Sequence, residues 1–195
     1  MAVEIELKVR IDFPDEIKTR FSSFAAYCCK YEKSDTYWYF PDSDYSKLRV
    51  RQELKTTAEE QTSRSIVTCK TREMRGGIEV NDEKEFTVSD REIFEELLRK
   101  LGLQAGIKKQ KRGWAWEYRE ESFPPVLAEL SEVLSLDCTV KPLGWFLELE
   151  ITGSTFDEDS IGQYREHLLN VLKKLKIPIE KIECRPYSEL LARGC

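Results

Sequence analysis

The sequence contains one histidine among its 195 residues, and this scarcity argues against several kinds of functional site. A zinc centre built on several histidines and a Ser-His-Asp triad both depend on that side chain. The single copy, His167, lies in a stretch whose apolar residues recur at helical spacing. We therefore expect neither a histidine-based metal site nor a serine-hydrolase triad.

Long apolar segments and redox motifs are also absent from the sequence. No apolar run approaches the roughly 20 residues that cross a bilayer. The six cysteines include no Cys-x-x-Cys pair, and the adjacent Cys28 and Cys29 fall in a pattern that favours a helix. The first residues form an acidic, strand-like segment rather than a signal peptide. We expect a cytoplasmic protein with reduced thiols that makes no contact with a membrane.

The charge balance limits the class of partner. The chain has 31 basic and 36 acidic residues, which gives a net charge of −5. It is not a polycation, so we expect no nucleic-acid partner, and any anion site must arise from local clustering of basic residues. The length and the 41% of hydrophobic residues are sufficient for a full core. We expect one domain over residues 1–195.

Residues 3–11 alternate strictly between apolar and charged side chains, which predicts a β-strand with one buried face. The charged face carries Glu4, Glu6, Lys8 and Arg10. Two carboxylates on one face can share a hard divalent cation, and the two basic side chains can hold a phosphate. A solvated sheet face with cross-strand ion pairs would have the same pattern. This strand alone leaves both interpretations open.

Acidic pairs recur on two later strand patterns. Glu148 and Glu150 repeat the first arrangement, and residues 79–85 place Glu83 and Glu85 on one face. Acidic strands that converge would repel one another without a cation. Two such strands can therefore meet around one or two Mg²⁺ or Mn²⁺ ions, whose ligands are carboxylate oxygens.

Basic pairs occur on three further strand patterns. The pairs are Arg49 with Arg51, Lys70 with Arg72, and a basic run over residues 108–112. Each alone is typical of a surface cluster, but together they suit an extended chain of phosphates. In the run, Lys109 and Lys111 share one face, and Lys108 and Arg112 share the other. Counting residues does not tell which face points inward.

The order of elements predicts an α+β fold with a dominant antiparallel sheet. We expect helices at about 14–28, 89–101 and 157–175, and a short helix at 186–191. Residues 54–64 are predicted to be a hairpin loop. The aromatic clusters at 37–40 and 114–116 are interpreted as packing residues. An open sheet and a closed barrel both fit the alternation of charge.

Taken in order, these motifs resemble those of the CYTH superfamily, the triphosphate tunnel metalloenzymes, which is named for class IV adenylate cyclases and thiamine triphosphatases. The resemblance covers about residues 2–192 and rests on a series of short segments. They are Glu4-x-Glu6-x-Lys8, Asp35-Thr36-Tyr37, Leu48-Arg49-Val50-Arg51, Lys70, the acidic strand 79–86, Lys111-Arg112, Leu136-Asp137, the segment 143–150, and the tail 187–191.

The resemblance implies a closed antiparallel eight-stranded β-barrel, with helices packed outside and a charged tunnel inside. It implies that acidic side chains bind Mg²⁺ or Mn²⁺, namely Glu4, Glu6, Glu148 and Glu150, with Asp137, Glu83 and Glu85 as weaker candidates. It implies that basic side chains bind the triphosphate, namely Lys8, Arg49, Arg51, Lys70, Lys111 and Arg112. The expected catalytic set is Glu4, Glu6, Lys8, Glu148 and Glu150.

Three functions fit this set. The first is metal-dependent hydrolysis of inorganic, nucleoside or thiamine triphosphate. The second is a class IV adenylate cyclase that converts ATP to cyclic AMP and pyrophosphate, and the third is a polyphosphate- or nucleotide-binding module without turnover. Hydrolysis is favoured because it needs no nucleobase pocket, and the sequence identifies none. The expected partner is a small molecule that contains a triphosphate, and the protein is expected to be a monomer or a homodimer.

Overall fold

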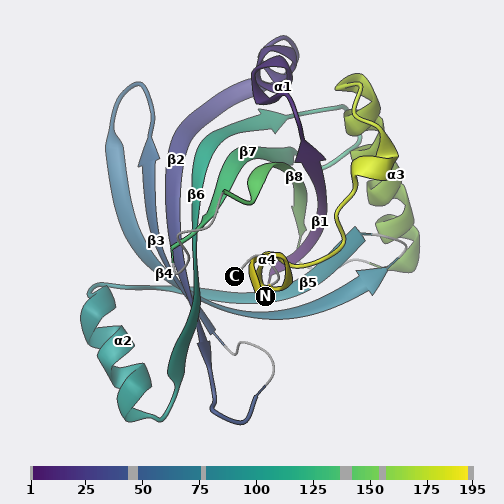
Figure 1. Ribbon diagram of the computed structural model, residues 1–195. Helices are drawn as coiled ribbons and strands as arrows, with labels where there is room; N and C mark the ends of the chain where they lie inside the picture. The colour runs from purple at the N-terminus through teal and green to yellow at the C-terminus, as the bar shows by residue number, and fades with distance from the viewer. Residues whose placement is uncertain (1, 44–47, 76–77, 137–141, 154–156, 193–195) are drawn as a thin grey trace.

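In the computed structural model, eight antiparallel strands close into a barrel in the order β1-β5-β4-β3-β2-β6-β7-β8 (Figure 1). The structure describes residues 2–43, 48–75, 78–136, 142–153 and 157–192. The closed barrel settles the choice between an open and a closed sheet. The strands are β1 Ala2–Ile11, β2 Ala26–Tyr39, β3 Leu48–Thr56, β4 Gln61–Arg75, β5 Ile78–Val88, β6 Gln104–Tyr118, β7 Val126–Ser135 and β8 Gly144–Gly153.

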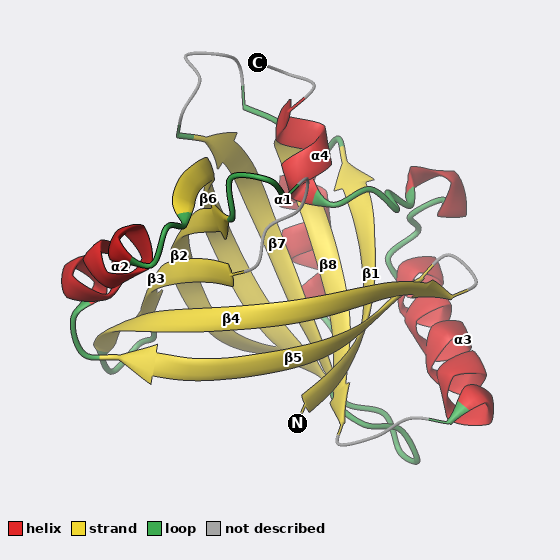
Figure 2. Cartoon of the chain, turned by 90° about the horizontal axis from the view of Figure 1, so that it is seen from below, coloured by secondary structure: helices red, strands yellow, loops and turns green. Residues whose placement is uncertain are grey.

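The helices lie outside the barrel wall or at one of its ends (Figure 2). They are α1 Pro14–Phe21, α2 Arg91–Lys100, α3 Glu158–Lys174, the single 3₁₀ turn η1 Ile179–Lys181, and α4 Tyr187–Ala192. Asp90 and Asp157 cap α2 and α3 by accepting hydrogen bonds from the backbone N–H groups of Ile93 and Ser160, at 3.0 and 2.8 Å. These caps satisfy N–H groups that have no partner within the helix.

The largest apolar cluster lies on the outside of the barrel wall. In β1, the apolar side chains of Ile5, Leu7 and Val9 are fully buried on the outer face. They belong to one packed cluster with Leu168 and Leu172 of α3. Because side chains alternate across a strand, this packing turns the charged residues of β1 toward the barrel interior. The alternation in the sequence therefore decides which face of the wall is polar.

Two of the predicted elements differ from the structure in their bounds. The helix expected to run through Cys28 ends at Phe21, and Cys28 and Cys29 lie in β2. The reason is that strand pairing with β6 over residues 26–39 overrides the apolar spacing at 24 and 28. The expected loop at 54–64 is shorter, because β3 and β4 pair as far as Thr56 and Gln61. The short C-terminal helix is present as α4.

The structure bears on two further predictions, that the cysteines are reduced thiols and that the aromatic clusters are packing residues. Cys28, Cys29 and Cys69 are free thiols, while Cys138 and Cys195 lie outside the described residues. Trp38 and Trp116 are completely buried, in line with a packing role, whereas Tyr37 and Tyr39 line the barrel interior and Phe40 is exposed. Among the helices of the described part of the chain, none is both long and apolar enough to cross a membrane.

Candidate functional site: a charged barrel interior

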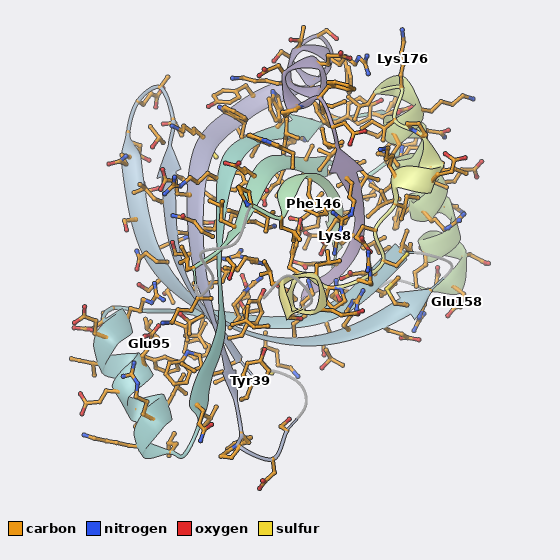
Figure 3. The ribbon with its side chains drawn as sticks, viewed as in Figure 1. Lys8, Tyr39, Glu95, Phe146, Glu158 and Lys176 are labelled. Atoms are coloured by element: carbon orange, nitrogen blue, oxygen red, sulfur yellow. The ribbon has the colours of Figure 1, made fainter. Side chains whose placement is uncertain are left out.

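The barrel encloses a cavity of about 1160 Å³ that is lined mainly by charged side chains. All eight strands and α4 contribute to the lining. Figure 3 shows Lys8 and Phe146 within the ring of strands, whereas Glu95 and Glu158 lie outside it on α2 and α3. An enclosed space lined in this way holds charges of both signs at low solvent exposure, where electrostatic interactions are strong.

Acidic side chains from three strands gather on one part of the cavity wall. Lys70 of β4 lies among them, with its Nζ 2.6 Å from Glu83, 3.4 Å from Glu4 and 3.5 Å from Glu6. Burial and the neighbouring Glu150 together raise the pKa of Glu4 to about 9, against the effect of Lys70. Burial also raises the pKa values of Glu6 and Glu150. These three carboxyl groups therefore resist ionisation, although Lys70 acts to lower their pKa values.

The donor atoms of this cluster fit a hard divalent cation. They are carboxylate oxygens, which are the ligands that Mg²⁺ and Mn²⁺ prefer. Asn81 of β5 lies in register with Glu4, is completely buried, and has no hydrogen-bond partner for its amide among the described residues. Among the described residues, no three acidic, histidine or cysteine side chains are arranged so that they could hold a metal ion together. The fit rests on donor chemistry and on buried acids whose ionised form a cation would favour, and the Lys70 ammonium lies among these acids.

The opposite charge dominates where β2, β3 and β6 meet. Arg51 donates two hydrogen bonds to Asp35, at 2.7 and 3.0 Å, and the Nζ of Lys109 lies 3.1 Å from the same carboxylate. Lys109 also donates to the hydroxyl of Tyr37 at 3.0 Å. Burial would raise the pKa of Asp35, but Arg51 and Lys109 outweigh it and hold that pKa well below its usual range. Two cations share one buried anion and leave positive charge facing the cavity.

Two further ion pairs cross the interior. Lys111 of β6 donates to Glu148 of β8, and Lys33 of β2 donates to Glu129 of β7. Burial opposes ionisation of Glu148, but Lys111 and Lys109 outweigh it and lower its pKa. The same balance, with Lys33 as the main cation, lowers the pKa of Glu129. Both carboxylates are therefore ionised without a metal ion.

Most residues expected from the sequence come together in this cavity. The lining contains Glu4, Glu6, Lys8, Arg49, Arg51, Lys70, Glu83, Glu85, Lys111, Glu148 and Glu150. Glu85 is the most accessible of the acids, and it accepts hydrogen bonds from Thr68 and Arg49 at 2.6 and 3.2 Å. Asp137 lies outside the described residues.

The expected position of Arg112 is wrong. Its side chain is 53% exposed on the outer face of β6, where its Nε lies 3.7 Å from Glu32. Lys109 and Lys111 occupy the inner face instead. The physical reason is the strand period of two, which forces Arg112 outward once Lys111 points inward.

Sequence reasoning missed several residues of the interior. Lys33, Lys109 and Glu129 line the cavity, and Asp35 is buried against Arg51 and Lys109. The sequence does contain a pattern that indicates Glu129, because this residue stands between the apolar Ala128 and Leu130 in a strand and so faces away from the core. The same alternation places Lys33 and Asp35 on one face of β2. Recognising them required knowing which strands are neighbours.

Fold and site together define a barrel protein with a charged interior suited to polyanions and cations. The chain belongs to the CYTH family, since the model of the CYTH domain matches residues 2–187. A comparison with curated proteins gave no match.

Solved structures with the same fold come from several kinds of organism. The PH1819 protein from Pyrococcus horikoshii OT3 is 27% identical, with a TM-score of 0.77 over 98% of this chain and 99% of that one. A candidate adenylate cyclase from Vibrio parahaemolyticus is 18% identical, with a TM-score of 0.73 over 97% of each chain. HpAC1 from Hippeastrum, with a dominant triphosphatase activity, is 14% identical, with a TM-score of 0.62 over 100% of this chain and 97% of that one. The last two likenesses establish the fold alone.

Proposed function

We propose that this protein hydrolyses a triphosphate substrate, inorganic, nucleoside or thiamine triphosphate, with the help of Mg²⁺ or Mn²⁺. The observation that carries the proposal is the presence of two walls of opposite charge in one enclosed cavity. Glu4, Glu6 and Glu150 resist ionisation beside Lys70 alone, and a divalent cation would favour their charged form. Arg51 and Lys109 have more positive charge than Asp35 neutralises. A cation bound to an extended phosphate chain complements both walls at once.

The roles of the side chains follow from their charge and position. Lys8, Arg49, Arg51, Lys70 and Lys111 bind phosphate oxygens, and Arg51 offers the planar fork that suits them. Glu4, Glu6, Glu148 and Glu150 hold the cation, and Glu83 and Glu85 extend this acidic wall. When bound, the cation neutralises developing charge and makes water a better nucleophile. The protein contributes by positioning the phosphate chain and excluding bulk water.

A class IV adenylate cyclase is the second candidate. The cavity lining includes Tyr39, Leu48 and Ile107, which provide an apolar surface near the cations where a nucleobase can pack. Hydrolysis remains the first choice because it needs no such contact. A binding module without turnover is disfavoured, because retaining anions gains nothing from a cluster of repelling carboxylates.

Product analysis separates the three functions. The purified protein is incubated with inorganic triphosphate and, separately, with ATP, in the presence of Mg²⁺ or Mn²⁺. Release of orthophosphate supports the hydrolase, whereas cyclic AMP with pyrophosphate supports the cyclase. Binding of triphosphate without any product would support the module and overturn the proposed reaction.

A further inference from the structure

Tyr187 is the first residue of α4, the helix that lies over one end of the barrel (Figure 2). Its side chain enters the cavity and is only 6% exposed. The ring packs edge-on against Phe146 of β8, with 5.1 Å between ring centroids. Leu190 and Leu191 of the same helix are buried with Phe146 in one apolar cluster. These contacts fix the position of Tyr187.

Three lysines converge on the ring of Tyr187. The Nζ atoms of Lys8, Lys109 and Lys111 lie 4.6, 4.7 and 5.0 Å from its centroid. Lys8 comes from β1 and the other two from β6, so the ring brings together cations from separate strands. An ammonium group within about 6 Å of a tyrosine ring is attracted by the ring's quadrupole. This attraction offsets part of the repulsion among three buried positive charges.

The hydroxyl group of Tyr187 is buried beside Glu148 and makes no hydrogen bond of ordinary geometry among the described residues. Burial raises its pKa well above the usual value, and the nearby Glu148 adds to this rise, so the group stays protonated. Buried polar groups without a partner are rare in folded proteins and require an explanation. A protonated donor that faces a cavity rich in cations is suited to an anionic acceptor.

We propose that Tyr187 is a substrate-binding residue whose ring gathers Lys8, Lys109 and Lys111 and whose hydroxyl donates a hydrogen bond to an oxygen of a condensed phosphate. The identity of the ligand rests on the function proposed above. The C-terminal helix thereby completes the phosphate site, in addition to its packing against Phe146.

The test measures the binding of inorganic triphosphate by calorimetry, without added metal, so that it does not depend on turnover. Tyr187→Phe removes the hydroxyl and keeps the ring, and we expect about tenfold weaker binding with an unchanged melting temperature, as for loss of one hydrogen bond to a charged group. Tyr187→Leu also removes the ring, and we expect binding to weaken further. The control is Tyr118→Phe, whose hydroxyl bonds Glu120 and Lys174 away from the cavity, and we expect it to bind as the wild type does.

The outcomes distinguish this inference from the proposed function. If the wild type binds triphosphate and Tyr187→Phe binds equally well, the role of the hydroxyl is wrong. If Tyr187→Leu binds as well as Tyr187→Phe, the role of the ring in gathering the lysines is wrong. A wild-type protein that binds no triphosphate without metal overturns the inference alone, whereas the proposed function fails only if no product forms in the presence of Mg²⁺ or Mn²⁺.

Discussion

Replacing Asp35 by asparagine tests whether the basic wall is held together by one buried anion. Asp35 is 1% exposed and is shared by Arg51 and Lys109. The substitution keeps the size of the side chain and removes its charge. Two cations then remain buried side by side without the anion that separates them. We expect the ligand-free protein to lose stability for this reason.

The expected loss follows from the geometry. Removing one partner of a buried ion pair typically costs about 3–5 kcal/mol, because the other charge stays buried. The amide oxygen of asparagine can still accept a hydrogen bond from Arg51, so we expect the lower end, about 3 kcal/mol. For a chain of this size, that corresponds to a decrease of roughly 6–12 °C in melting temperature.

The dependence of this loss on pH has a definite sign. Arg51 and Lys109 hold the folded-state pKa of Asp35 well below its value in the unfolded chain. A group of this kind stabilises the folded state at pH above its unfolded pKa of about 3.9, and the effect disappears as the pH falls through the folded pKa. The difference between wild type and Asp35→Asn is therefore constant from pH 5 to 8 and decreases only in strong acid.

The assay is urea unfolding followed by tryptophan fluorescence at several pH values. The matched control is Glu32→Gln on the same strand, whose carboxylate lies on the outer face 3.7 Å from Arg112. Both partners of this pair are substantially exposed, so we expect the control to change stability by less than about 1 kcal/mol. A loss of under 1 kcal/mol in Asp35→Asn, or a loss equal to that of the control, would refute the reasoning.

Four other predictions address the cavity and its wall. Glu6→Gln should abolish turnover but retain the circular dichroism spectrum, because the amide resembles the protonated acid that burial favours; a retained rate would remove Glu6 from the site. Arg51→Ala should weaken triphosphate binding by about 1.5–3 kcal/mol in calorimetry, the scale of a charged hydrogen bond, and unchanged affinity would contradict its role. Mn²⁺ binding near neutral pH should release protons and become tighter as the pH rises, because the pKa of Glu4 is raised to about 9 and a metal ligand must be deprotonated. Calorimetry in buffers of different ionisation enthalpy measures this proton release, and a result of none would contradict the prediction. Gly113→Ala should destabilise the barrel by at least 1 kcal/mol in urea unfolding, because its Cβ would lie 1.9 Å from the carbonyl oxygen of Leu130, and a smaller effect would show that the strands can separate there.

The predictable part of the fold was the assignment of faces along single strands. Strict alternation at Ile5, Glu6 and Leu7 is enough to separate a core-facing row from a charged row. In the basic run 108–112 both faces of the strand carry positive charge. Alternation therefore separates the residues into two faces but does not show which face points into the barrel. Only the pairing of β6 with β2 and β7 decides that Lys111 faces inward and Arg112 outward.

The missed part of the site depends on contacts between strands distant in the chain. Lys33 and Glu129 are 96 positions apart, and nothing local to either residue indicates the other. The sequence motif that includes Asp35 was recognised, but its role as the anion between Arg51 and Lys109 depends on β2 lying between β3 and β6. Barrel closure itself entered as an implication of family resemblance, because the same alternation fits an open sheet.

The division between core and cavity explains how a barrel can tolerate so many buried charges. The apolar cluster that includes Leu7 and Leu168 lies between the wall and α3, where burial of apolar surface stabilises the fold. Ion pairs inside a protein are weak contributors to stability, because desolvation offsets their attraction. The pair between Lys111 and Glu148 is therefore poorly explained as a stabilising element. It is better explained as a pair of groups kept charged and close together, each able to exchange its partner for a phosphate oxygen or a cation.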